Sequence, residues 1–414
     1  MKIERPRGTR DFLPEEMERR REVERRMREI AESFGYREIA TPTFEHLELF
    51  TLKSGEGIVD EMYVFADKSG RKLALRPELT APVMRMFVNE CSVMPRPLRF
   101  YYFANCFRYE RPQKGRYREF WQFGVELIGS DSYLADAEVI NLAYRILDSL
   151  GIKFELQIGH VGILRSILSS LGTERASKVM RLIDKGDKEG LLGYMDEIRV
   201  EQDLREKVLS IIDMKGDEGV IEEAKKLISF DFTHLENLSR ILRELGVEFE
   251  LNLGIARGLD YYTGVVFECY AEGLGAQKQV CGGGSYELSS LFGGPKTPST
   301  GFAIGFDRVC EVCDAKAKKR TTVAVISFKG LESHAFRIAD RIRERGLRVV
   351  VDVMERSVKK QMSFASEISA DYAVIIGPEE IEKGVVTVKD MTTQEQRAMK
   401  EEEAITTFLS RMRG

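Results

Sequence analysis

Charged and aromatic side chains are concentrated between residues 107 and 126, in the stretch FRYERPQKGRYREFWQFGVE. Arg108 and Glu110 are two positions apart on a predicted strand, so their side chains point to the same side. Gln122 and Glu126 share one face of the partner strand for the same reason. A sheet face with this composition is unsuited to a hydrophobic core. It suits a zwitterion or a nucleotide, because arginine binds phosphate through two hydrogen bonds and a carboxylate binds an ammonium group.

The turn between these two strands, RPQKGRY, is basic. Its positive side chains suit a polyanion such as a phosphate chain or the end of an RNA. Gly124 has no side chain, which predicts space for a ligand against the sheet. The structural alternative is a solvent-exposed hairpin held by cross-strand ion pairs. The residues of this stretch do not decide between the two interpretations.

Two further motifs place polar residues in predicted turns. LRPELT contains Glu78 and Thr80, and its structural alternative is a turn in which Thr80 caps the following helix. IARGLDYYTG places Arg257 and two adjacent tyrosines in a loop bounded by glycines. Its structural alternative is an ordinary β-turn with a tyrosine in the core.

Two other motifs lie in glycine-rich sequence. CGGGSYE, residues 281–287, has three consecutive glycines, which allow unusual backbone angles and close approach of the backbone. Its structural alternative is a flexible loop. STGFAIGFDRV places Arg308 just inside a predicted helix, where an arginine is usually a surface residue.

Several common catalytic and metal-binding patterns are absent from the sequence. It contains no GxxxxGK[ST] phosphate-binding loop. Its four histidines are scattered along the chain, which disfavours a histidine-based metal site or a Ser-His-Asp triad. Cys310 and Cys313 have the spacing of a zinc-ligand pair, but they lack a second pair and fall in a predicted helix. We therefore expect no metal ion held by a fixed cluster of protein side chains.

Length and composition restrict the class of protein. A chain of 414 residues with 43% hydrophobic residues predicts two or three domains with substantial cores. The formal net charge of −4 gives no overall positive field for nucleic acid, although a local basic patch is compatible with it. The six cysteines lack the spacing of a disulfide framework, which favours the reducing cytoplasm. No signal peptide is recognisable, and no apolar run approaches the length of about 20 residues that a membrane span needs.

The elements that must position these motifs follow two patterns. Residues 98–129 are predicted to form a long antiparallel hairpin, and strand signals return after a helical insertion at about 165–245. From 321 to 414, strands alternate with helices, which predicts a small α/β domain with a largely parallel sheet. We therefore expect one domain over residues 1–320 and a second over residues 321–414.

Taken together, the motifs resemble a known family. Three of them resemble the signature motifs of class II aminoacyl-tRNA synthetases, namely FRYE with Arg108, GFDR with Arg308 and ATPTFEHLELF with Pro42. Four further motifs resemble those of histidyl-tRNA synthetases in particular, namely RGTRDFLP, LRPELT, ERPQKGRYREF and ARGLDYYTG. The resemblance covers nearly the whole chain. It implies an α+β catalytic domain with a class II antiparallel sheet flanked by helices, a helical insertion, and a C-terminal α/β anticodon-binding domain.

The resemblance also implies a two-step reaction. L-histidine and ATP form histidyl-adenylate and pyrophosphate, and histidine then passes to the 3′-terminal adenosine of histidine tRNA. No nucleophilic side chain is needed, because the histidine carboxylate attacks the α-phosphate and the site neutralises the charge that develops there. Mg²⁺ accompanies ATP. The resemblance further implies a cytoplasmic homodimer without membrane contact, and an insertion that contacts the acceptor arm of the tRNA.

Individual roles follow from the same resemblance. Arg108 and Arg257 are implied to act at the α-phosphate of ATP, and Arg308 at its γ-phosphate end. Arg116 is implied to meet ATP or the acceptor end of the tRNA. The implied histidine-binding residues, of which the two tyrosines line the imidazole pocket, are Glu78, Thr80, Gln122, Glu126, Tyr261 and Tyr262.

The chain departs from the family pattern at a few positions. Ser285 and Glu287 stand where an arginine and an aspartate are usual, which puts a local ion pair in doubt. Leu79 stands where a glycine is common. None of these departures removes a residue that the resemblance assigns to phosphate chemistry.

Three other interpretations remain open at this point. Regulatory subunits of the ATP phosphoribosyltransferase of histidine biosynthesis resemble these synthetases but usually lack the C-terminal domain. A synthetase of the same subclass for proline, threonine or glycine is disfavoured by RGLDYYTG. Inactive histidyl-like domains that sense uncharged tRNA usually occur in longer chains. The arginines at 108, 257 and 308, together with the C-terminal domain, favour an active synthetase.

Overall fold

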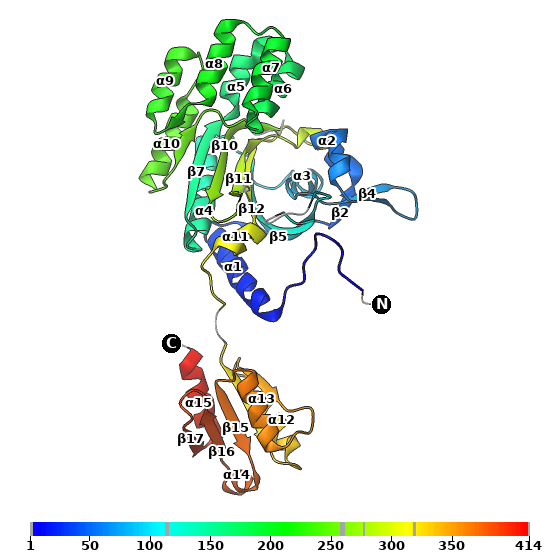
Figure 1. Cartoon of the computed structure of the whole chain (residues 1–414), viewed down its shortest axis with the longest axis vertical. Helices are drawn as coiled ribbons and strands as arrows, with labels where there is room; N and C mark the ends of the chain where they lie inside the picture. Colours follow the sequence, from blue (N-terminus) through cyan, green and yellow to red (C-terminus); the bar gives the residue numbers. More distant parts are fainter. Residues whose placement is uncertain (1–2, 112–115, 257–260, 276–277, 318–319, 413–414) are drawn as a thin grey trace. The chain divides into compact units, whose positions relative to one another are not determined.

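The computed structural model describes residues 3–111, 116–256, 261–275, 278–317 and 320–412. The chain forms two compact units, residues 1–317 and residues 318–414. The first unit contains a nine-stranded sheet and a three-stranded sheet, and the second contains a five-stranded sheet (Figure 1). Among the helices described, none combines the length and the hydropathy that crossing a membrane requires.

The large sheet of the first unit is built around the predicted antiparallel strands. Its members are β1 (Arg37–Glu38), β5 (Leu98–Phe107), β6 (Glu119–Ile128), β7 (Phe154–His160), β8 (Lys215–Gly216), β9 (Glu250–Asn252), β10 (Tyr262–Ala271), β11 (Gln279–Tyr286) and β12 (Ser299–Gly305). Their order in the sheet is β1-β5-β6-β12-β11-β10-β7-β9-β8. Every pair from β5 to β7 in this order is antiparallel, whereas β1 pairs with β5 and β9 pairs with β7 in parallel. The predicted class II type of sheet is confirmed.

The hairpin of β5 and β6 gives the sheet two different faces. Leu98 pairs with Ile128 at one end and Phe107 with Glu119 at the other, as the sequence predicts for residues 98–129. Successive side chains of a strand point to opposite faces, so Phe123, Val125 and Leu127 enter the main core while Gln122 and Glu126 point the other way.

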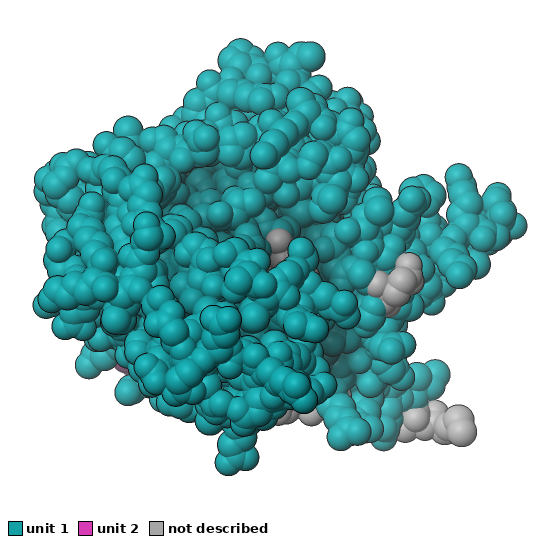
Figure 2. All heavy atoms as spheres, turned by 90° about the horizontal axis from the view of Figure 1, so that it is seen from above, with its two compact units in different colours: residues 1–317 teal, residues 318–414 magenta. Residues whose placement is uncertain are grey.

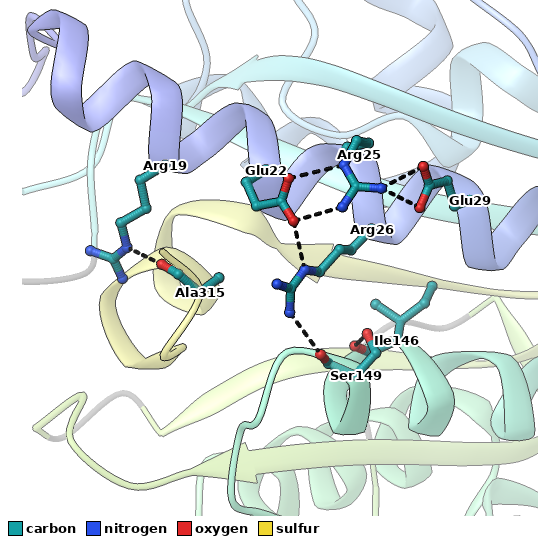
Figure 3. A network of polar contacts seen from close by, with 8 residues as sticks. All are labelled: Arg19, Glu22, Arg25, Arg26, Glu29, Ile146, Ser149 and Ala315. Carbon is teal, nitrogen blue, oxygen red and sulfur yellow. Dashed lines mark hydrogen bonds and ion pairs between the residues drawn. The ribbon is translucent and has the colours of Figure 1, made fainter. Parts of the chain in front are cut away.

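Two helices cover the core face of this sheet, namely α1 (Pro14–Ser33) and α4 (Tyr133–Ser149). Val23 and Met27 of α1 are fully buried there, at the helical spacing that predicts an apolar stripe. Beside this stripe, Glu22 pairs with both Arg25 and Arg26, and Arg26 also donates to the carbonyl oxygen of Ser149 at the end of α4 (Figure 3).

Along the chain, the remaining helices of the first unit come before the β5–β6 hairpin, between the later strands of the sheet, and after its last strand. The segment before the hairpin forms α2 (Leu47–Ser54), α3 (Thr80–Met86) and the small sheet of β2 (Phe44–His46), β3 (Val64–Ala66) and β4 (Lys72–Leu75). The predicted insertion forms α5 (Val161–Leu168), α6 (Thr173–Asp184), α7 (Lys188–Glu197), α8 (Gln202–Ile212), α9 (Gly219–Leu227) and α10 (Thr233–Glu244), gathered at one end of the unit in Figure 1. The unit ends with α11 (Phe306–Val312), and short 3-10 or π segments occupy Glu56–Glu61, Phe87–Cys91, Ser169–Leu171 and Ser290–Phe292.

The second unit has a mixed sheet. Its strands are β13 (Thr322–Ser327), β14 (Arg348–Val351), β15 (Tyr372–Ile376), β16 (Val386–Asp390) and β17 (Gln396–Met399), and its helices are α12 (Glu332–Arg343), α13 (Val358–Glu367), α14 (Pro378–Lys383) and α15 (Glu401–Met412). β13 is parallel to β14 and β15, but β16 is antiparallel to both of its neighbours. The prediction of a largely parallel sheet is therefore wrong for the last two strands. The connections before and after β16 are too short for the crossover that parallel pairing requires.

Candidate active site

A pocket of about 420 Å³ opens on the face of the nine-stranded sheet opposite to the main core. Figure 2 shows the first unit as spheres, with a surface hollowed near the centre of the view. Arg257 lies outside the described residues. The pocket is lined by every other site residue that the sequence predicts, namely Glu78, Thr80, Arg108, Arg116, Gln122, Glu126, Tyr261, Tyr262 and Arg308.

Glu126 is a buried carboxyl group in the wall of this pocket, with only 1% of the residue exposed. The Tyr286 hydroxyl donates a hydrogen bond to its Oε2 at 2.5 Å, and the Tyr102 hydroxyl donates to Oε1 at 3.4 Å. Burial raises the pKa of Glu126 to about 8, although the hydrogen bond from Tyr286 acts in the opposite direction. The carboxyl group of Glu126 is therefore mostly protonated at pH 7.

Two glycines near Glu126 have different roles. Gly301 of β12 pairs with Glu126, and a Cβ at position 301 would lie 2.1 Å from Glu126 Oε2. Glycine at 301 thus leaves the space that the carboxylate occupies. A Cβ at Gly124 would lie 2.4 Å from the Tyr102 hydroxyl. The prediction that Gly124 leaves room for a ligand is wrong, because the Tyr102 ring fills that space.

A buried ion pair lies beside the two tyrosines of the pocket. Lys53 of α2 has a side chain only 4% exposed, and its Nζ is 3.1 Å from Glu78 Oε2 and 4.4 Å from the centroid of the Tyr261 ring. Sequence reasoning missed Lys53, because nothing in TLKS distinguishes a buried lysine from a surface one.

Glu78 has a second role at the start of α3. Its carboxylate accepts hydrogen bonds from the backbone N–H groups of Thr80, at 2.7 Å, and Ala81, at 3.1 Å. The structural alternative in which Thr80 caps this helix is therefore wrong. Thr80 is the first helical residue, and Glu78 reaches the N–H groups that the first turn leaves without partners.

Three arginines bring positive charge to the same pocket. Arg108 Nε donates to the Pro77 carbonyl oxygen at 3.0 Å, and Arg308 Nη1 donates to the Gln279 carbonyl oxygen at 2.7 Å. Burial lowers the pKa of Arg308, and the nearby charges of Arg116 and Arg108 lower it further. Guanidinium groups held this close to one another favour the binding of a polyanion.

Glu110 compensates part of this positive charge. Its Oε2 lies 2.7 Å from Arg116 Nε, and its Oε1 lies 3.9 Å from Arg108 Nη1. Arg108 and Glu110 both come after the last residue of β5, so the prediction that they lie on the strand is wrong, although both side chains line the pocket. The described residues contain no group of three or more His, Cys, Asp or Glu side chains that could hold a metal ion.

The CGGGSYE motif is part of a strand, so the structural alternative of a flexible loop is wrong. Residues 282–284 lie in β11 and pair with β10 and β12. A Cβ at Gly283 would lie 2.2 Å from the Gly301 carbonyl oxygen, so the absence of a side chain allows this close strand packing.

Ser285 and Glu287, which replace the usual arginine and aspartate, form no ion pair with each other, because serine carries no charge. Ser285 Oγ donates to Asp136 Oδ1 at 2.8 Å, and Asp136 Oδ2 is also 2.8 Å from His234 Nε2. Glu287 accepts hydrogen bonds from the hydroxyls of Ser289 and Ser290. Each residue therefore has its own polar partners, and Tyr286 between them still reaches Glu126.

The geometry of the pocket agrees with the comparisons to known proteins. Residues 8–309 match the family model described as histidyl-tRNA synthetase, and residues 322–411 match the model described as anticodon binding domain. A histidine–tRNA ligase of Archaeoglobus fulgidus is 75% identical over 403 residues, which cover 97% of this chain and 98% of that protein. One of Methanosarcina acetivorans is 51% identical, with 98% of both chains covered.

Solved structures give the same result for the fold. The crystal structure of apo histidyl-tRNA synthetase from S. aureus matches with a TM-score of 0.72 and 27% identity, over 98% of this chain and 100% of that chain. The resemblance and the fold class inferred from the sequence are thus confirmed. The chain belongs to the histidyl-tRNA synthetase family, the enzymes that attach histidine to its tRNA.

Proposed function

We propose that this pocket activates L-histidine with ATP, and that the chain then transfers histidine to the 3′-terminal adenosine of histidine tRNA. The observation that carries the proposal is the lining of one pocket by the buried Glu126 and Tyr286 and by Arg108, Arg116 and Arg308. The first two suit the side chain of an amino acid, and the three arginines suit the phosphates of a nucleotide. Activation requires both substrates in one cavity.

The proposed histidine subsite combines carboxylates with aromatic rings. Glu126 receives an N–H of the imidazole, and the Tyr261 and Tyr262 rings, whose centroids are 4.7 Å apart, line its apolar part. The α-amino group of histidine lies near Glu78, with Thr80 and Gln122 completing its surroundings. Lys53 holds the Glu78 carboxylate in place through their ion pair.

The proposed chemistry is electrostatic. The histidine carboxylate attacks the α-phosphorus of ATP, the bond from that phosphorus to the bridging oxygen breaks, and pyrophosphate leaves. Arg108 stabilises the charge on the α-phosphate, with Arg257 as a second cation, and Arg308 binds the γ-phosphate end. Arg116 binds ATP or the acceptor end of the tRNA.

Mg²⁺ enters this proposal together with ATP. It binds through substrate phosphates and one or two carboxylates, at oxygen ligands. Glu61 and Glu110 line the pocket and are close in the chain fold, because Tyr109 N–H donates to the Glu61 carbonyl oxygen at 2.8 Å. Carboxylate oxygens are the ligands that Mg²⁺ prefers, so these two side chains would hold the ion together with the substrate phosphates, and the ion would supply charge neutralisation there.

The chain is further proposed to act as a homodimer. Phe44 and Phe65 on the three-stranded sheet are 52% and 41% exposed, and their ring centroids are 6.1 Å apart. Neighbouring exposed aromatic residues mark an interaction surface, and the first signature motif runs directly into this sheet. Light scattering should give a mass about twice that of the 47.2 kDa chain, and a monomer at micromolar concentration would refute the dimer.

The proposed activation step is tested by ATP–pyrophosphate exchange with each of the twenty amino acids. We expect exchange with histidine alone, because the pocket provides a buried carboxyl group for the imidazole. The exchange should stop when EDTA removes Mg²⁺ and return when Mg²⁺ is added in excess. Folded protein that exchanges with no amino acid would instead indicate a regulatory or tRNA-sensing relative.

A further inference from the structure

No residue of the N-terminal motif RGTRDFLP lines the pocket described above. In the structure it forms an irregular segment that leads into α1. The Arg118 N–H donates a hydrogen bond to the Gly8 carbonyl oxygen at 2.9 Å. The segment is therefore attached to the base of the β5–β6 hairpin, close to the residues that line the pocket.

Arg10 of this segment makes two contacts at once. Its Nη2 is 2.5 Å from Asp307 Oδ1, and its guanidinium carbon is 3.5 Å from the centroid of the Tyr117 ring. Tyr117 and Asp307 both line the pocket, whereas Arg10 does not. Arg10 thus lies behind the pocket wall and joins two parts of that wall that are 190 positions apart in sequence.

Each contact of Arg10 is one residue away from an arginine of the pocket. Tyr117 follows Arg116, and Asp307 precedes Arg308. The contacts of Arg10 therefore bear on the two chain segments from which the side chains of Arg116 and Arg308 extend into the pocket.

Asp307 remains well supported without Arg10. Its Oδ1 also accepts from Arg20 Nη1 at 2.7 Å, and its Oδ2 accepts from the Trp121 N–H at 2.7 Å. Loss of Arg10 is therefore expected to leave Asp307 and α11 in place and to loosen the Tyr117 ring, which then keeps only the bond from its hydroxyl to Glu311 of α11, at 3.3 Å. This separates a positioning effect from a general loss of folding.

We propose that Arg10 is a positioning residue for ATP: by linking Tyr117 to Asp307, it sets the separation of Arg116 and Arg308. The inference rests on the proposed function, in which these arginines bind the phosphates. A planar guanidinium can stack flat on a ring while its N–H groups bond a carboxylate in the plane, a geometry that an ammonium group, which has no flat face, does not reproduce.

The test is Arg10→Met, which keeps an unbranched side chain but removes both contacts. We expect the KM for ATP in histidine-dependent pyrophosphate exchange to rise roughly ten-fold, as for a displaced binding group, while the KM for histidine changes less than about two-fold. Arg10→Lys should give an intermediate KM for ATP. Tyr117→Leu should reproduce the effect of Arg10→Met, and the double variant should add little to either.

Arg19→Met is the matched control. Arg19 also anchors the N-terminal part of the chain to the region of α11, through the carbonyl oxygens of Cys310 and Ala315, and Figure 3 shows the second bond. It is bonded to neither Tyr117 nor Asp307 in this arrangement, so its loss should lower the melting temperature without changing the KM for ATP.

Two results would overturn the proposal. One is an unchanged KM for ATP in both Arg10→Met and Tyr117→Leu. The other is an equal rise of the KM values for ATP and histidine in Arg10→Met and Arg19→Met, which would show a purely structural role. If Arg10→Met does not fold, the KM values for ATP of Arg10→Lys and Tyr117→Leu test the proposal instead. If the wild-type protein shows no exchange, the proposed function fails, and ATP titrations followed by the fluorescence of Trp121 in the pocket still compare the variants.

Discussion

Replacing Arg308 with alanine is expected to lower the kcat of histidine-dependent pyrophosphate exchange by about 10²- to 10³-fold, the usual effect of removing one group that stabilises transition-state charge. Arg308 is positioned before the substrate binds, because its Nη1 bonds to the Gln279 carbonyl oxygen at 2.7 Å. A group that is already oriented needs no rearrangement when charge develops on the phosphates. The measurement is exchange at saturating ATP and histidine, so that the loss is read in kcat.

Two companion variants make this result specific. Arg308→Lys should recover only part of the activity, because it keeps the charge but loses the two-pronged geometry that matches phosphate. Arg25→Ala removes an arginine that pairs with Glu22 and Glu29 on the surface of α1, and it should leave the exchange unchanged (Figure 3). A kcat within two-fold of wild type in Arg308→Ala would contradict the role assigned to this residue.

The sequence predicts which residues share a face of the hairpin, because alternation along a strand is a local property. It does not predict on its own that Arg108 and Arg308 meet. That convergence depends on β6 pairing with β12, whose residues are about 175 positions apart, and such a pairing has no local signal. Only the resemblance to a known family provided it, through motifs that occur together.

The residues that were missed or misjudged share one physical cause. Burial against segments distant in sequence explains the ion pair of Lys53, the position of the Tyr102 ring and the contacts of Asp307. The same is true of Gly124, where the neighbouring Tyr102 ring decides that no space remains. A local pattern shows which way a side chain points but not what occupies the space there.

The second large effect is expected at Glu126, in the coupling of histidine binding to protons. With a pKa of about 8 before histidine binds, roughly nine tenths of Glu126 is protonated at pH 7. An imidazole N–H bound against the carboxylate favours the ionised form and lowers this pKa. Histidine binding at pH 7 should therefore release close to one proton from Glu126, and the affinity should rise between pH 7 and 8 and level off above that range.

Glu126→Gln isolates this proton, because it keeps the shape of the side chain and cannot ionise. Calorimetry in two buffers with different ionisation enthalpies measures the protons released, and the difference between the wild type and Glu126→Gln belongs to Glu126. The variant should also bind histidine roughly 10- to 100-fold more weakly, as expected for the loss of a charged hydrogen bond. Equal proton release in the two proteins would show that Glu126 does not change its protonation state on binding.

The same pKa shift gives an independent check in the absence of substrate. The folded protein keeps the Glu126 proton up to about pH 8, whereas the unfolded chain loses it near the ordinary value of 4.5. The contribution of Glu126 to stability is therefore fully present below pH 4.5 and is lost as the pH rises towards 8. Relative to the wild type, Glu126→Gln should be more stable at pH 8.5 than at pH 5. Melting temperatures at the two pH values measure this, and an identical difference at both would mean that the Glu126 pKa is not raised in the folded protein without substrate.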